Sequence, residues 1–317
     1  MHVIDAIKQA KRYLLSLEIT PPNKGTSIDE LYGTLDMLMP YKPAFINVTY
    51  HQPQVVYEEK DGVIYRIPKR KKPGTVGICA SIANRYQIDT VPHFSCGGFS
   101  KFETEDALID LHYLGLHNIL ALRGDPPQGS RDFIPERDGH QYASELVKQI
   151  TDMNQGIYME ELEDPQPTNF CIGVAAYPEK HFESPNFEKD LANLKHKVEQ
   201  GAHYIITQMF FDFEYYKSFV EKAREIGITV PIIPGIKPLS TMRQLTLIPS
   251  YFNVNIPHHI VEAMEAARTR EQVRKAAVKK AIELCQKLVD YGVPGIHIYT
   301  MGKGATTREL LDALIGK

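Results

Sequence analysis

The chain has 317 residues, a length at which a closed α/β barrel still forms a single domain. Its apolar fraction of 43% is ordinary for a soluble globular protein and argues against an intrinsically disordered one. The 36 Lys and Arg residues nearly balance the 39 Asp and Glu residues, which argues against nucleic acid or an anionic membrane surface as a partner.

The sequence lacks export and metal-binding patterns. No signal-type segment opens the chain and no stretch of about 18 apolar residues occurs, so we expect a cytoplasmic protein that does not enter a membrane. No pair of cysteines has the C-x-x-C spacing, so we expect buried thiols and no metal site. The cysteines are Cys79, Cys96, Cys171 and Cys285.

Short β-rich segments alternate with helical patterns along the whole chain. Each β-rich segment ends in a turn or a polar residue, and helical apolar spacing follows in segments such as 104–116, 187–201 and 215–226. The strand candidates, in chain order, are 13–20, 44–50, 90–95, 118–123, 170–177, 204–209, 230–235 and 295–300.

This order favours an α/β fold, a single-domain (β/α)8 TIM barrel over residues 1–317, with an open doubly wound sheet as the alternative. No G-x-G-x-x-G motif follows the first strand, which weakens that alternative. Two gaps are long. The first holds a polar segment, 52–73, which we interpret as a solvated loop of no assigned role, and a helix at 76–86. The second predicts extra helices between 257 and 291, before the last strand.

Polar residues gather at the ends of the predicted strands, where barrels of this type place their active sites. Glu18 is the most unusual, because a carboxylate in the apolar strand LLSLEIT is costly unless it is paired, solvated or functional. In isolation it is equally well explained as a structural ion-pair partner. The whole set is Glu18, Thr49, His93, Arg123 with Asp125, Tyr177, Gln208 and Tyr299.

The segment ILALRGDPP is the most specific local feature. It brings a cation, a flexible glycine and a carboxylate to the predicted barrel mouth, and two prolines stiffen its exit. Alternatively, it is an ordinary Asp-Pro turn with an exposed arginine.

The helix predicted at 186–201 has an apolar face and a second, polar row. Asp190, Asn193 and Lys197 form that row at three-and-four spacing. A solvated surface explains such a row, and so does an edge that meets a polyol or a phosphate.

With these motifs in view, the sequence resembles the methylenetetrahydrofolate reductase family, in its bacterial form of a catalytic barrel alone. The likeness runs from LEITPP at Leu17 to IYTMG at Ile298. Between them come FINVTY, VPHFSC, ALRGDPP, VAAYPEKH, DLANLKHKVEQGA, ITQMFFD and IIPGI, in the order of the family's strands and helix.

The resemblance implies an oxidoreductase with non-covalent FAD at the barrel mouth. NADH or NADPH would reduce the flavin, which would then reduce 5,10-methylenetetrahydrofolate to 5-methyltetrahydrofolate in a ping-pong reaction that supplies methionine synthesis. A homo-oligomer is also expected. The implied FAD contacts are Thr49, His93, Arg123, Gly124, Asp125, Tyr142, Ala143, Tyr177, His181, Asp190, Asn193, His196 and Lys197.

The resemblance also implies roles in the folate reaction. Hydride reaches the bridging methylene only after protonation opens the ring to an iminium cation, so a general acid is required, and Glu18 is the candidate. An apolar barrel top would raise its pKa. Asp125 would stabilise the cation, Gln208 would hydrogen-bond the folate, and Tyr299 and Lys303 would line the mouth near its tail.

Several positions depart from the family pattern. Gly302-Lys303 replaces an Asn-Arg pair, an aliphatic residue near Ile248 replaces an aromatic, and His196 stands where arginine is common. Two alternatives stay open. One is a barrel aldolase or lyase that uses Lys237 as a Schiff base. The other is a non-catalytic flavin- or folate-binding subunit.

Overall fold

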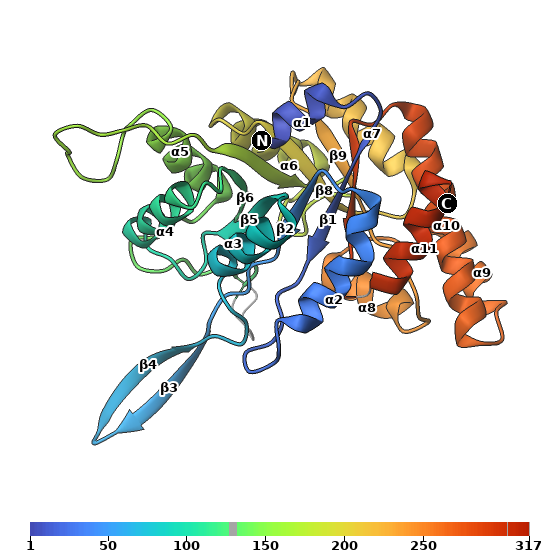
Figure 1. The fold of residues 1–317 in the computed structure, drawn as a ribbon, viewed down its shortest axis with the longest axis horizontal. Coiled ribbons are helices and arrows are strands. Elements are labelled where there is room, and N and C mark those ends of the chain that lie inside the picture. Colours follow the sequence, from blue (N-terminus) through green and yellow to red (C-terminus); the bar gives the residue numbers. More distant parts are fainter. Residues whose placement is uncertain (127–131, 303, 317) are drawn as a thin grey trace.

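The computed structural model describes residues 1–126, 132–302 and 304–316, and its centre is a closed barrel of parallel strands (Figure 1). This confirms the (β/α)8 fold, and each predicted strand forms. Around the barrel, β1 adjoins β2, followed by β5, β6, β7, β8, β9 and β10, which returns to β1. The strands are β1 Leu14–Ile19, β2 Phe45–Val48, β5 Asp89–Ser95, β6 Asn118–Leu122, β7 Cys171–Ala176, β8 Tyr204–Met209, β9 Ile232–Ile236 and β10 Gly295–Tyr299.

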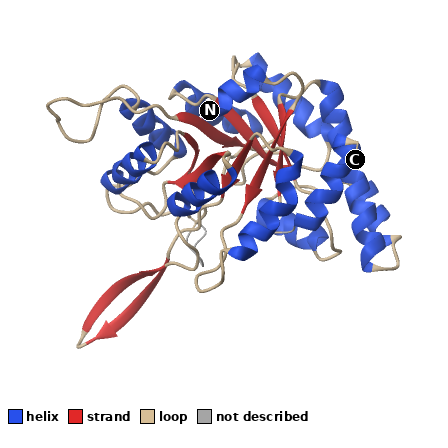
Figure 2. Cartoon of the chain, in the orientation of Figure 1, coloured by secondary structure: helices blue, strands red, loops and turns tan. Residues whose placement is uncertain are grey.

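Helices surround the barrel and bury the outer faces of its strands (Figure 2). The expected extra helices before the last strand are present: α9 packs against α10, which in turn covers β9. The helices are α1 Val3–Gln9, α2 Asp29–Leu38, α3 Thr75–Tyr86, α4 Lys101–Tyr113, α5 Ala143–Met153, α6 Phe187–Glu199, α7 Phe213–Glu225, α8 Gln244–Phe252, α9 His258–Glu265, α10 Arg270–Tyr291 and α11 Gly304–Ile315, with the short 3-10 helix η1 Met39–Tyr41.

Helix ends follow local capping signals. The side chain of Ser100 accepts from the Glu103 N–H, and the Glu103 carboxylate accepts from the Ser100 N–H. This capping box starts α4 at Lys101, three residues before the start that the apolar spacing suggested. Asn186 caps α6 in the same manner by accepting from the Lys189 N–H.

The barrel interior is apolar at its amino-terminal end and polar at its carboxyl end. Inward residues such as Leu14, Phe45 and Tyr204 form one buried cluster, and Val3 of α1 packs into it. The Val3 N–H donates to Asn118 Oδ1 at 2.8 Å, so α1 is held against that end of the barrel. Function is therefore left to the opposite end.

Residues 54–69 form a β-hairpin, so the interpretation of 52–73 as a loop was wrong. β3 Gln54–Lys60 pairs antiparallel with β4 Val63–Lys69 and projects away from the barrel (Figure 1). Asp61 and Gly62 have φ of 53° and 73°, the two-residue turn that an Asp-Gly pair favours. The expected exposure of the segment is confirmed for most of its side chains.

All four cysteines are free and buried, as expected. Burial raises the pKa of Cys171 to about 11 and that of Cys285 to about 12, so these thiols stay protonated and unreactive near neutral pH.

Candidate active site

Strand register brings most of the predicted residues to one mouth of the barrel. Glu18 of β1 is level with Tyr299 of β10 on one side and with Asn47 of β2 on the other. Thr49 and Tyr177 each follow their strands by one residue, and Gln208 lies within the last two residues of β8. The carboxyl ends of parallel strands meet at one edge, which explains why residues distant in sequence gather there.

Glu18 is a protonated acid at this mouth. Its side chain is 14% exposed, and its Oε2 lies 3.5 Å from His93 Nε2. Burial raises the pKa of Glu18 to about 8, against the opposing charge of Lys237. Burial lowers the pKa of His93 to about 3, helped by the nearby His51. Near pH 7 both groups are neutral, so this contact joins a carboxylic acid to an uncharged imidazole.

Polar side chains line the barrel both beneath Glu18 and level with it. Ser16 Oγ lies 2.9 Å from His297 Nδ1, and Asn47 Nδ2 lies 3.3 Å from His93 Nε2. Within the described part of the chain, the buried atoms Asn47 Oδ1 and Thr49 Oγ1 have no hydrogen-bond partner. Unmet buried polar atoms are costly, so these two indicate that a polar ligand completes the mouth.

The Arg-Gly-Asp turn after β6 is held tightly. Both guanidinium Nη atoms of Arg123 bond the Glu183 carboxylate, with Nη2 to Oε1 at 2.7 Å. Gly124 has φ +92°, and a Cβ there would lie 2.2 Å from Ser95 Oγ, so no other residue fits without a shift. Gln52 Nε2 donates to the Asp125 carbonyl at 2.8 Å. The turn therefore presents the exposed Asp125 carboxylate in a defined direction.

The polar row on α6 divides into two kinds of residue. Asp190 accepts from the His181 N–H at 3.0 Å and from Ser184 Oγ at 2.7 Å, which fixes the loop before the helix. Lys197 Nζ donates to the Ala175 carbonyl at 2.6 Å. Burial lowers the pKa of Lys197 to about 8. A half-buried ammonium with a carbonyl partner suits a phosphate ligand.

The other expected flavin contacts lie near the mouth or on the surface. Asn193 and His196 are exposed on α6. The ring of Tyr177 packs edge-on against the ring of His181 at 4.6 Å. Tyr142 precedes α5 with 56% of its surface exposed, and Ala143 is the first residue of that helix.

The residues expected to bind folate lie on the far side of the mouth. Tyr299 OH donates to the Thr207 carbonyl at 2.7 Å, and Gln208 Oε1 accepts from the Met209 N–H. Lys303 lies outside the described residues. Ile248 is 4% exposed and packs in an apolar cluster. The side chain of Ile248 therefore packs in the apolar core beside the barrel mouth and is not exposed in the mouth itself.

Sequence reasoning overlooked two residues of this region and gave a third a different role. Gln52 and Glu183 hold the Arg-Gly-Asp turn from loops that no pattern linked to it. Lys237 follows β9 and is 3% exposed, yet the sequence suggested only a Schiff-base role for it. Its signal was a lysine directly after the apolar strand IIPGI, the same strand-end position that singled out Glu18.

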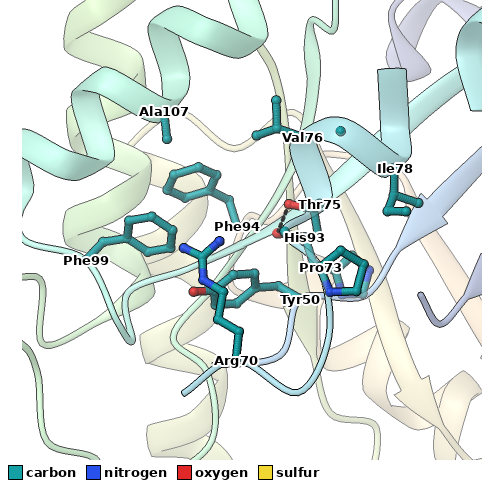
Figure 3. Close-up of a pocket in the computed structure, with 12 residues that line it drawn as sticks. Tyr50, Arg70, Pro73, Thr75, Val76, Ile78, His93, Phe94, Phe99 and Ala107 are labelled. Carbon is teal, nitrogen blue, oxygen red and sulfur yellow. Dashed lines mark hydrogen bonds between the residues drawn. The ribbon is translucent and has the colours of Figure 1, made fainter. Parts of the chain in front are cut away.

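A cavity of about 410 Å³ adjoins the mouth behind β5 (Figure 3). The rings of Phe94 and Phe99 stack at 5.3 Å, and Tyr50 approaches Phe99 at 5.6 Å. Thr75 Oγ1 donates to the His93 carbonyl at 3.5 Å, which anchors the start of α3 to the strand that carries His93. The cavity and the mouth thus share His93, which lines the cavity and also contacts Glu18.

The raised pKa of Glu18 lowers the stability of the folded protein at neutral pH. The Glu18 carboxyl ionises near pH 4.5 in the unfolded chain but near pH 8 in the folded protein. Its contribution to the free energy of unfolding is therefore fully present below pH 4.5 and is lost as the pH rises through 8. We expect Glu18→Gln to raise the free energy of unfolding by about 3 kcal/mol at pH 7 and hardly at pH 4.5. Urea unfolding of both proteins across this range measures the difference. A difference that does not change with pH would contradict the assignment.

No group of three or more His, Cys, Asp or Glu side chains is placed to hold a metal ion in residues 1–126, 132–302 and 304–316. Across those same ranges, no helix combines the length and the apolar character needed to cross a membrane.

The chain is similar in sequence to proteins of one family. The family model described as methylenetetrahydrofolate reductase matches residues 3–315. Methylenetetrahydrofolate reductase 1 of Schizosaccharomyces pombe is 31% identical over 94% of this chain and 45% of its own length. The 5,10-methylenetetrahydrofolate reductase of Escherichia coli is 32% identical over 95% of this chain and 90% of its own length. The chain spans about half the length of the eukaryotic relatives it matches.

Solved structures support the fold. A Clostridium thermocellum protein, described as binding two copies of 5-methyl-5,6,7,8-tetrahydrofolic acid, superimposes with a TM-score of 0.57 at 14% sequence identity. The superposition covers 98% of this chain and 96% of that protein. The match to the family model over nearly the whole chain, together with the barrel and its mouth, shows that this chain belongs to the methylenetetrahydrofolate reductase family.

Proposed function

We propose that this chain reduces 5,10-methylenetetrahydrofolate to 5-methyltetrahydrofolate, with FAD as the bound cofactor and NADH or NADPH as the electron donor. The observation that carries the proposal is Glu18, a carboxyl with a pKa near 8 at the barrel mouth. Relatives described as NADPH-dependent and as NADH-dependent both match this chain, which supports a nicotinamide donor of either kind. The folate-binding Clostridium thermocellum structure supports a folate substrate.

The residues on the β2, β5 and β7 side of the mouth suit a flavin dinucleotide. The unpartnered Thr49 Oγ1 fits a ring heteroatom, and the half-buried Lys197 ammonium fits the pyrophosphate. The rigid Arg-Gly-Asp turn would hold the dinucleotide from the β6 side. When bound, FAD accepts hydride from the nicotinamide and delivers it to the folate.

Glu18 holds the proton that the folate step needs. The protonated carboxyl would donate to the leaving nitrogen of the methylene bridge, which opens the ring and leaves a cationic carbon for hydride. Asp125, exposed and aimed by its turn, would stabilise that cation, and Gln208 would hydrogen-bond the pterin.

We expect the purified protein to be yellow and to bleach when NADH or NADPH is added without oxygen or folate. The reason is that FAD reduction requires only the nicotinamide. Absorbance at the flavin band measures both the cofactor and its reduction. Folate should then restore the colour. A colourless protein that also fails to bind added FAD would exclude the proposed function.

A further inference from the structure

Lys237 stands in the same row of the barrel mouth as Glu18. β1 adjoins β10, and β10 adjoins β9. Glu18 is level with Tyr299, and Ile298 is level with Ile236, so the next residue, Lys237, is level with Tyr299 from the other side. Glu18, Tyr299 and Lys237 therefore lie in one row across three neighbouring strands, with Tyr299 between the other two. Because the strands of a barrel are tilted, this row rises towards the mouth at Lys237.

The side chain of Lys237 continues the inward-facing row of β9. Ile233 belongs to the cluster inside the barrel, and a Cβ at Gly235 would lie 2.5 Å from the Tyr299 ring. Lys237 follows two residues later, the period with which strand residues return to the same face. It is 3% exposed.

The other titratable groups that face Glu18 carry no charge near pH 7. Burial lowers the pKa of His93 and of His297, one layer below, to about 3, so both imidazoles are neutral. Burial, with the charge of Glu18 next, raises the pKa of Tyr299, so its phenol stays protonated. On the β2 side, the neighbouring polar side chains are the amide of Asn47 and the hydroxyl of Thr49, which carry no charge. Among the described residues around Glu18, the cation is therefore Lys237, and its charge opposes the rise in the pKa of Glu18.

We propose that Lys237 is a positioning residue for the folate step, where its ammonium stabilises the Glu18 carboxylate that remains after proton transfer. The inference rests on the proposed function. In the step, the Glu18 O–H bond breaks, an N–H bond forms on the leaving folate nitrogen, and that nitrogen keeps the electron pair of its broken C–N bond. The products are a carboxylate and a cationic carbon, so charge is conserved. The ammonium pairs with the carboxylate and does not form a covalent bond with the substrate.

The first test measures the charge state of Glu18 without any substrate. Protein with [δ-13C]glutamate is titrated by NMR, and the Glu18 signal is assigned by its loss in Glu18→Gln. The expected midpoint is about pH 8 in the wild type. In Lys237→Met, which keeps the side-chain length without the charge, it should rise by about 1 to 3 pH units. Lys237→Arg should keep it near the wild-type value, as should Lys279→Met, which removes an exposed lysine of α10.

The second test measures the folate half-reaction in the same variants. Lys237→Met should slow folate-dependent reoxidation at pH 7 by about tenfold and move its alkaline limb to higher pH. A merely structural role would leave that limb in place. If the Glu18 midpoint in Lys237→Met equals the wild-type midpoint, the inference is wrong. Folate turnover by the wild-type protein would still support the proposed function in that case. If the Glu18 midpoint moves in Lys237→Met but the wild-type protein has no folate activity, the proposed function is wrong. The role of Lys237 in proton transfer is then wrong as well, but its charge pairing with Glu18 stands.

Discussion

Glu18→Gln should slow folate-dependent reoxidation of the reduced enzyme by about 10²- to 10⁴-fold, the usual contribution of a general acid. Glutamine keeps nearly the same shape and hydrogen-bonding reach but cannot deliver a proton. Flavin binding and reduction by NADH should stay near the wild-type level, because neither step uses that proton. Stopped-flow measurement of the two half-reactions separates these effects.

The matched control is Glu105→Gln, the same substitution at a buried glutamate of α4. The Glu105 carboxylate accepts from the Met159 N–H at 2.8 Å and lies outside the mouth, so both half-reactions should be unaffected while stability falls. If Glu18 were only structural, its variant would behave like this control. An unchanged rate of folate-dependent reoxidation in Glu18→Gln would exclude Glu18 as the proton donor.

Lys197→Met should weaken FAD binding by about 10- to 100-fold, the loss expected for one hydrogen bond to a charged group. Lys197 is held at the mouth by the Ala175 carbonyl, and burial lowers the pKa of its ammonium to about 8, so the ammonium suits a phosphate. Methionine fills the same space without a partly desolvated charge. The flavin-free variant should therefore be at least as stable as the flavin-free wild type. Fluorescence titration of FAD and urea unfolding of the flavin-free proteins measure the two effects.

Lys195→Met on the same helix provides the comparison. Its side chain is 44% exposed and its ammonium pairs only distantly with Glu199, at 3.8 Å, so FAD affinity should not change. A Lys197→Met protein with normal FAD affinity and reduced stability would show that Lys197 serves only to hold the end of β7.

The hairpin and the α6 row show where sequence patterns stop short. The Asp-Gly turn and its flanking β-branched residues were present in the sequence, but the basic residues beside them suggested a solvated loop. On α6, spacing placed Asp190 and Lys197 in one row, whereas Asp190 bonds the loop before the helix and Lys197 bonds a strand. The spacing of residues along the sequence determines which of them share a helix face, but their hydrogen-bond partners belong to other elements of the fold.

The order of strands and helices, the polar strand ends and the Arg-Gly-Asp turn were determined by the sequence alone. Apolar periodicity and turn residues are local properties, and closing the barrel then brings the strand ends together. The charge of Glu18 was decided by the tertiary structure, because its pKa depends on burial and on Lys237, which is more than 200 residues away in the chain. Desolvation and charge pairing act through space, so no sequence interval records them.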